Sequence, residues 1–545
     1  MKRILLFLVC SLTLGALSAT ESGKGQGASY YNAGFPQVAK PLLLNEYKSN
    51  PANSSEVCYY LGNIYFEENN LDSAAYYFNI GTSAQPVSTL NTVGLIMMKM
   101  KSDMPGAENE IKNLLKIKGN KKNEALLISI SRAYLVNGKL DKATEFQSMV
   151  KSLKPKSANG AVLLGDIRLA KNELGPACGS YETAILYDEN CKEAYIKYAR
   201  AYKNANPKLA ISMLERLKQN QPDFLLADRE LADIYYAQNN FEKAAELYEV
   251  YLKSGNSNVQ DLTKYALTLF LNKNFEKSLE VANMGLQKAP RNPALNRLAM
   301  WNNIDLKRFE EGLKAADKFF NQTDKPDFTY LDYRYYGQAL RETKQFDLSI
   351  QQFEIALKMD STKTELWKDI SDMYSDKGDL QNSINTYIKY MNSLSDDKKT
   401  ADVKIALGKL YYSLGNSKDA GQDIKTNALL KADTIFAQVF SIEPTVYRGV
   451  FWRARTNSVL DPETSKGLAK PYYEQTVAIV EPKADSRYNS VLIECYSYLG
   501  YYFILQNDNL NSLAYWNKII AIDPNNATAK KAMDGIQKVL NKTKK

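Results

Sequence analysis

Apolar residues recur along this chain at the three- and four-residue spacing of amphipathic helices. In one such block Cys58, Leu61, Gly62 and Tyr65 would share a single helix face. Turn-forming residues separate successive blocks, at Asn69-Asn70, Asn137-Gly138, Asn239-Asn240, Lys377-Gly378-Asp379 and Asn507-Asp508-Asn509. The pattern therefore predicts a long series of helical hairpins.

The hairpins follow a fixed spacing of small, aromatic and proline residues. Steps of 3, 12, 16 and 24 residues from Gly62 reach Tyr65, Ala74, Phe78 and Pro86. Similar steps start from other small residues, here called anchors, at Ser131, Gly165, Ala232, Ala266, Gly337, Ser371 and Gly500, and a degenerate anchor lies at Ala199. From Ser131 to Ala266 the intervals between anchors are 34, 34, 33 and 34 residues, which indicates a structural repeat.

Each slot has a physical reason. Small residues at the anchor and at plus twelve let two antiparallel helices approach closely, and an aromatic side chain fills the space beside the contact. Proline at plus twenty-four ends the second helix and begins the link to the next hairpin. Degenerate copies have their anchors near Gly94, Ala199, Ala299, Gly408 and Ala454.

This pattern resembles the tetratricopeptide repeat (TPR) family over residues 51–525, with about thirteen repeats. The resemblance implies an all-α fold, a right-handed α-solenoid of TPR-like helical hairpins. Residues 526–545 are expected to add a C-terminal capping helix and a basic tail, because a repeat array exposes its last apolar face.

The N-terminus has the pattern of an export signal. A basic start, an apolar run from Ile4 to Leu17 and a small residue at Ala19 predict a cleaved signal peptide over residues 1–19. Cys10 lies within that run in a poor context for lipidation, so we expect a periplasmic or secreted product without a lipid anchor. Residues 20–50 are expected to be a flexible linker and N-terminal lead-in. No later apolar run is long enough for a transmembrane segment.

One repeat departs clearly from the regular spacing. In the repeat anchored at Gly408 the later slots reappear at Ala432, Phe436 and Pro444, each displaced by twelve residues. We therefore expect an insertion between its two helices at about residues 416–431. The next repeat carries three extra residues before Ala469. Insertions in repeat proteins are often at the binding face, and a tolerated loop elaboration is the open alternative.

Composition excludes most enzyme classes. The chain has no histidine, which removes the usual general base and the commonest metal ligand. No phosphate-binding loop, nucleophile motif or metal-ligand spacing is present either, so we expect no enzyme, no cofactor and no metal site. A glycosidase that uses only Asp and Glu is the enzymatic alternative.

Cys178 and Cys191 are expected to be buried free thiols, because a helix would separate them beyond bridging distance.

The resemblance also implies a concave groove lined by the first helices of successive repeats, at positions minus three, plus one and plus four from each anchor. The candidate partner-binding residues are Tyr59, Asn63, Arg200, Arg229, Asp233, Arg334, Gln338, Arg341, Lys368, Asp372, Lys409 and Tyr412. For each position a solvated helix face is the alternative. The positions around Gly337, Ser371 and Gly408 would form a mainly basic strip suited to an acidic partner segment.

These observations predict a non-catalytic scaffold or assembly factor of the cell envelope that binds protein or peptide partners. A structural or glycan-associated envelope protein that acts through its outer face stays open as an alternative. The family's clamp for chaperone C-terminal carboxylates needs a Lys together with an Asn in the first groove helix. This chain has Tyr59 in place of the Lys beside Asn63, so we do not predict that class of partner. Nucleic acid is not expected, because the positive excess lies in residues 99–156, with 13 basic and 6 acidic residues and little aromatic interleaving.

Overall fold

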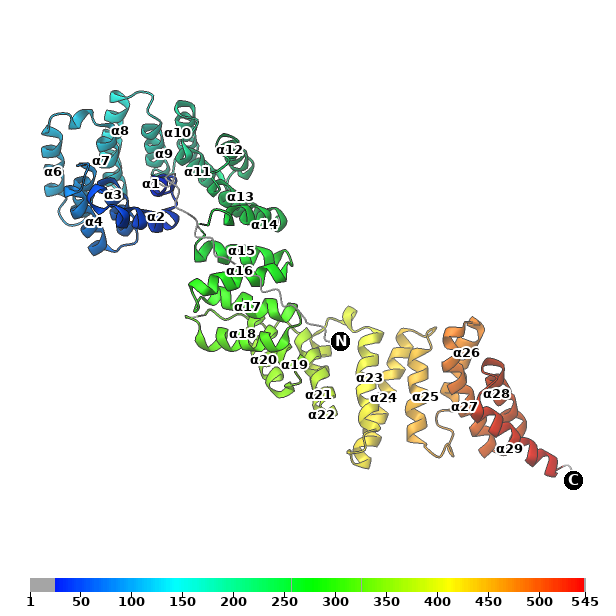
Figure 1. The fold of residues 1–545 in the computed structure, drawn as a ribbon. Coiled ribbons are helices and arrows are strands. Elements are labelled where there is room, and N and C mark those ends of the chain that lie inside the picture. Colours follow the sequence, from blue (N-terminus) through cyan, green and yellow to red (C-terminus); the bar gives the residue numbers. More distant parts are fainter. Residues whose placement is uncertain (1–24, 256, 325, 544–545) are drawn as a thin grey trace, which may run out of the picture. The chain divides into compact units, whose positions relative to one another are not determined.

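The computed structural model of the chain describes residues 25–255, 257–324 and 326–543. All of the regular structure in these ranges is helical, which confirms the all-α prediction. The chain divides into two compact units, unit 1 up to Asn302 and unit 2 from Asn303, and each is described by itself (Figure 1). The predicted signal peptide, residues 1–19, lies outside the described residues.

Unit 1 begins with a helix pair that precedes the repeats and continues with the first repeats. Its α-helices are α1 (Gln26–Asn32), α2 (Pro36–Ser49), α3 (Ser55–Glu67), α4 (Leu71–Ser83), α5 (Leu90–Lys99), α6 (Met104–Lys116), α7 (Glu124–Val136), α8 (Leu140–Leu153), α9 (Ala158–Ala170), α10 (Leu174–Tyr187), α11 (Lys192–Tyr202), α12 (Pro207–Asn220), α13 (Leu226–Ala237), α14 (Phe241–Leu252), α15 (Val259–Leu271), α16 (Phe275–Lys288) and α17 (Pro293–Asp305), which runs past the boundary. Short 3₁₀ turns lie at Pro51–Asn53 and Asn120–Lys122.

Unit 2 continues the alternation of first and second helices. It contains α18 (Phe309–Gln322), α19 (Tyr330–Glu342), α20 (Phe346–Met359), α21 (Glu365–Asp376), α22 (Leu380–Ser393), α23 (Ala401–Gly415), α24 (Gln422–Ile442), α25 (Arg448–Leu460), α26 (Lys470–Val480), α27 (Asn489–Leu505), α28 (Asn509–Ile522) and α29 (Ala527–Thr543). Its 3₁₀ turns are Asp396–Lys398, Glu481–Lys483 and Ser486–Tyr488. Counted as successive pairs, α3 to α28 give the thirteen hairpins that the repeat predicts.

The anchor and aromatic slots meet inside the hairpins as predicted. A Cβ atom added to Gly62 would lie 2.4 Å from the Phe78 ring, and one added to Gly337 would lie 2.5 Å from the Phe353 ring. The same contact joins Gly165 to Tyr181, Gly408 to Phe436 and Gly500 to Trp516. Because a real side chain has no room at these distances, the ring packs directly on the anchor's backbone.

Serine in a small-residue slot adds a hydrogen bond between the two helices. The hydroxyl of Ser131, an anchor, donates to the Ala143 carbonyl at plus twelve over 2.7 Å. In other hairpins the plus-twelve serine donates back to the anchor, as from Ser349 to the Gly337 carbonyl over 2.6 Å. The small slots therefore satisfy a buried hydroxyl while keeping the helices close.

The turn inside each hairpin also repeats. The residue seven positions after the anchor adopts a left-handed backbone conformation, with φ of 58° at Asn69, 72° at Gly138 and 61° at Lys344. The next residue often caps the second helix, as where the Asn70 side chain accepts from the Ser73 N–H over 3.1 Å. Asn and Gly tolerate this conformation best, which explains the turn residues in the sequence.

The expectation of a flexible linker over residues 20–50 is corrected, because residues within 26–49 form the helix pair α1–α2. Tyr30, Val38 and Leu43 are buried in the core of unit 1. A Cβ atom on Gly27 would lie 2.7 Å from the Leu43 side chain. The glycine that indicated a linker therefore allows the two helices to pack closely.

The insertion at residues 416–431 is also corrected in form. The connection between α23 and α24 covers only residues 416–421, and α24 has 21 residues. Ala428 and Leu429 are buried and precede the displaced slot at Ala432 on the same helix. The extra residues therefore mostly lengthen the second helix, because their apolar spacing continues the buried face of α24.

The C-terminal helix packs on the repeats, and the four described cysteines are buried within them. α29 packs on the last hairpin and buries Ala529 and Ile536. Cys58, Cys178, Cys191 and Cys495 are all buried free thiols. Burial raises the pKa of the Cys191 thiol to about 11, which disfavours the reactive thiolate.

Replacement of Gly337 by Leu tests the local nature of this packing. We expect a loss of about 1–3 kcal/mol, because the new side chain must displace the Phe353 ring. Hydrogen exchange should rise in α19 to α22 and stay unchanged around Gly62, since repeats contact mainly their neighbours. The matched control is Gly535→Leu in α29, where nothing lies within 4 Å of the added Cβ. A uniform rise along the chain would contradict a repeat array.

Candidate functional site

The candidate residues in unit 1 lie on first helices but are held by the protein itself. Arg200 on α11 makes a two-point contact with the Glu230 carboxylate, at 3.0 and 2.7 Å. Arg229 on α13 donates to Asp261 over 2.6 Å and to Glu230 over 3.1 Å. Asp233 accepts from Lys264 over 2.8 Å. These side chains are therefore already neutralised within unit 1.

The ion pairs follow the repeat. Asp166 pairs with Lys197 over 2.5 Å, and the pairs Arg200–Glu230 and Asp233–Lys264 repeat the same relation farther along the chain. In each pair the plus-one residue of one repeat meets the minus-two residue of the next. This forms a ladder of charges between neighbouring first helices, with the sign alternating from repeat to repeat. Partly buried pairs of this kind add little net stability, because the cost of desolvating the charges offsets their attraction.

The α1–α2 hairpin covers part of the same face. The Phe35 ring lies under two guanidinium groups, 4.5 Å from that of Arg200 and 5.5 Å from that of Arg229. Arg200 also donates to the Gly34 carbonyl over 2.8 Å. Tyr30 packs on Phe224, with ring centroids 5.9 Å apart. The hairpin therefore connects the start of the repeats, where α2 packs on α3, to repeats more than 160 residues later.

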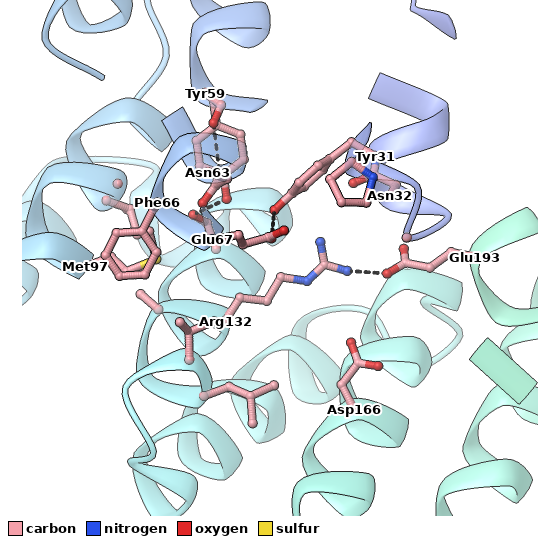
Figure 2. Close-up of a pocket in the computed structure, with 18 of the residues that line it drawn as sticks. Tyr31, Asn32, Tyr59, Asn63, Phe66, Glu67, Met97, Arg132, Asp166 and Glu193 are labelled. Carbon is pink, nitrogen blue, oxygen red and sulfur yellow. Dashed lines mark hydrogen bonds and ion pairs between the residues drawn. The ribbon is translucent and has the colours of Figure 1, made fainter. Parts of the chain in front are cut away.

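A cavity of about 260 Å³ remains between the α1–α2 turn and the first helices α3, α5, α7, α9 and α11 (Figure 2). Arg132 donates to Glu193 over 2.9 Å, and Lys197 contacts Glu193 over 2.8 Å as well as Asp166. Although burial opposes it, the cations Lys197 and Arg132 lower the pKa of Glu193. The attraction of Glu193 raises the pKa of Arg132 well above its usual value. Both ends of this network therefore stay charged.

The other side of the cavity lies on α3. The candidates Tyr59 and Asn63 both line it, and the Asn63 side chain is 9% exposed. The Tyr59 hydroxyl bonds to Ser129 over 2.9 Å, and the Asn63 amide donates to the Tyr59 carbonyl over 2.7 Å. One turn after Asn63, Glu67 accepts from the Tyr31 hydroxyl over 2.7 Å.

Sequence reasoning missed several of these residues. Arg132 and Asp166 occupy the plus-one slot of the anchors Ser131 and Gly165, so the slot rule applied to every repeat finds them. Lys197 and Glu193 lie at other offsets, where the only signal is charge complementarity, between Lys197 and Asp166 at a separation of 31 residues and between Glu193 and Arg132 at 61. Tyr31 belongs to the segment that was expected to be a linker.

The candidates of unit 2 form a more open surface. Arg334 on α19, Lys368 on α21 and Lys409 on α23 are exposed. Lys409 lies over the Trp452 ring at 5.0 Å, and the Tyr412 ring is 5.3 Å from the same ring. We call the exposed set Arg334, Lys368 and Lys409 the cationic strip.

Carboxylates lie beside the cationic strip, so the surface is less basic than expected. Arg341 donates to Asp369 over 3.2 Å, and Gln338 and Asp372 are half-buried. Burial raises the pKa of both Asp369 and Asp372, and nearby cations oppose the rise. Asp369 was missed because it lies at minus two from Ser371, outside the offsets used. Arg341 is therefore an internal ion-pair partner.

Two further findings concern the described residues as a whole. Their Cys, Asp and Glu side chains form no group of three or more that could hold a metal ion. No helix among them combines the length and apolar character needed to cross a bilayer.

Comparison with known proteins gives one family match. Residues 199–259, from within α11 to the start of α15, match the model of the tetratricopeptide repeat. No curated protein matches the sequence.

Several solved structures are similar to parts of the chain. The C-terminal part of a TPR repeat-containing protein from Cytophaga hutchinsonii is 29% identical, covers 50% of this chain and 99% of its own, and has a TM-score of 0.41. A tetratricopeptide repeat protein from Parabacteroides merdae is 17% identical, with coverages of 46% and 98% and a TM-score of 0.30. PilF of Pseudomonas aeruginosa is 15% identical, with coverages of 40% and 98% and a TM-score of 0.33.

The family assignment combines the match with the packing. The anchors, aromatic slots and left-handed turns recur in hairpins on both sides of the matched residues, in unit 1 and in unit 2. Residues 199–259 therefore match the tetratricopeptide repeat, and the described residues on both sides form similar helical hairpins.

Proposed function

We propose that this chain is a non-catalytic scaffold of the cell envelope that binds a protein partner on the first-helix face of unit 2. Tetratricopeptide repeat proteins are generally protein-interaction scaffolds, and repeat arrays offer extended surfaces to their partners. The proposal rests on a difference between the first-helix faces of the two units. The α1–α2 hairpin contacts the first-helix face of unit 1, whereas the cationic strip of unit 2 is exposed.

The chemistry of the strip favours an acidic partner segment. Arg334 and Lys368 have no ion-pair partner among the described side chains, so their charges are available. Arg can bind a carboxylate at two points, and Lys adds a point charge. Beside Lys409, the third residue of the strip, Trp452 and Tyr412 are of the residue types that dominate binding energy at protein interfaces.

The neighbouring acids give the strip selectivity. Asp369 is engaged by Arg341, and Asp372 lies beside Lys368. A long polyanion would meet these carboxylates as well as the cations. A partner with a few spaced acidic residues fits the mixed pattern better, because like charges placed against each other are costly.

The envelope location rests on the sequence of residues 1–19, which has the pattern of a signal peptide. We expect the mature protein to begin near Thr20 and to fractionate with soluble periplasmic or secreted proteins. Mass spectrometry of the N-terminal peptide from the native protein checks this. A mature chain that begins at a lipidated Cys10 would contradict it.

The strip itself is tested by replacing Arg334 and Lys368 together with Ala. Partners are first captured by crosslinking in the native envelope and then purified. We expect the double variant to bind its partner about tenfold more weakly, about 1.4 kcal/mol, because two unpaired charges are lost. The salt dependence of binding should also fall.

The control is Lys318→Ala with Lys358→Ala, which removes two exposed charges from the second helices α18 and α20. This control should bind like the wild type, and all variants should keep the helical circular dichroism signal and melting temperature. If the strip variant keeps both its affinity and its salt dependence, the strip is only a solvated helix face.

A further inference from the structure

Among the residues that line the cavity of unit 1, one accessible carboxylate, that of Glu67, forms no ion pair with a described side chain. Its lining includes three carboxylates, Glu67, Asp166 and Glu193, and two cations, Arg132 and Lys197. Both cations contact Glu193, and Lys197 also contacts Asp166. Among the described side chains, Glu67 receives a hydrogen bond only from the neutral Tyr31 hydroxyl. The lining therefore carries one excess negative charge, and it is located at Glu67 (Figure 2).

The cavity walls make the ionised form of Glu67 somewhat less favourable, although its side chain is exposed. Burial by the cavity walls raises the pKa of the Glu67 carboxyl, and the Tyr31 hydrogen bond and the more distant cations only oppose the rise. Its side chain is still solvent-accessible, so a ligand can reach it. A cation placed beside it would stabilise the ionised form.

A second acceptor lies one turn away on the same face of α3. Asn63 is more than nine-tenths buried and lines the cavity. Its Nδ2 donates one hydrogen bond to the Tyr59 carbonyl, and its Oδ1 acceptor has no partner among the described residues. Glu67 thus offers a charged acceptor and Asn63 a neutral one, which suits a ligand that carries several N–H groups.

Apolar side chains form much of the rest of the wall. Phe66, Val93, Met97 and Val136 are among the lining residues, and Figure 2 shows Phe66 and Met97 across the cavity from Glu193. At about 260 Å³ the cavity lies just below the range of about 300–1,000 Å³ typical of small-molecule pockets. It suits a single alkyl chain with one polar end. An anion would find both lining cations already engaged by Glu193 and Asp166.

We propose that this cavity binds one alkylammonium or alkylguanidinium group, with the charged end at Glu67 and Asn63 and the alkyl stem against Phe66 and Met97. This chemistry belongs both to the Lys or Arg side chain of a partner peptide and to a free small amine. The site is independent of the cationic strip of unit 2. Failure of either proposal therefore leaves the other standing.

The test uses the full-length protein and four probes: n-butylamine, n-butylguanidine, the blocked peptide acetyl-Ala-Lys-Ala-amide and its Met analogue. Binding is measured by saturation-transfer NMR and by titration. We expect at least one charged probe to bind in the millimolar range and the Met peptide to bind at least tenfold more weakly. Preference for the Lys peptide over the amines would identify a partner side chain as the source, and the reverse would identify a free amine.

Glu67→Gln is the decisive variant, because it keeps the shape and the acceptor for Tyr31 while it removes the charge. It should weaken binding of the charged probe at least tenfold. The matched control is Glu68→Gln, the same change at the next residue, which pairs with Lys40 outside the cavity. It should bind the probe like the wild type, and both variants should keep the melting temperature.

Three results would overturn the proposal. One is the absence of binding by every charged probe when the probe is present at millimolar concentration and in 10-fold excess over the protein. The cavity would then hold only water. Another is equal binding of the Met peptide, which would make the charge irrelevant. The third is unchanged probe affinity in Glu67→Gln.

Discussion

The close contact between an anchor and an aromatic ring is the constraint on which the structure depends. At Gly62, Gly165 and Gly337 the ring from the second helix lies where a Cβ atom would be, within 2.3 to 2.5 Å. This contact fixes how near the two helices of a hairpin come. Phe78 also packs on Gly94, so one ring connects two successive repeats. The spacing of the first helices, and therefore of every residue on their shared face, follows from it.

Once the first helices are set side by side, their charges decide what each unit can bind. In unit 1 the plus-one and minus-two positions carry opposite charges, so the face neutralises itself and the α1–α2 hairpin packs on it. A partner that docked on Arg200 and Arg229 would have to displace internal contacts, at the cost of leaving half-buried charges unpaired. In unit 2 the same kind of surface keeps Arg334 and Lys368 exposed. Two stretches of one repeat pattern thus have different binding properties.

The sequence predicts the hairpins well because the anchor slots are local and periodic. It predicts the surfaces less well, since each groove residue depends on partners about 30 residues away. Arg200 was read as a groove residue, and its role depends on Glu230 and Gly34, which no local pattern connects. The α1–α2 hairpin was missed because Gly25 and Gly27 suggest a linker when read without Leu43. The insertion was found by its length, but its helical form depends on Ala428 and Leu429 joining the core.

Hydrogen exchange of the complex with a partner captured in the envelope tests the central claim most directly, because it reports on the first helices of both units at once. The account predicts slower exchange on binding in α19, α21 and α23, with little change in α11 and α13. Protection confined to the second helices, or centred on α11 and α13, would contradict the claim that unit 2 presents the open binding face.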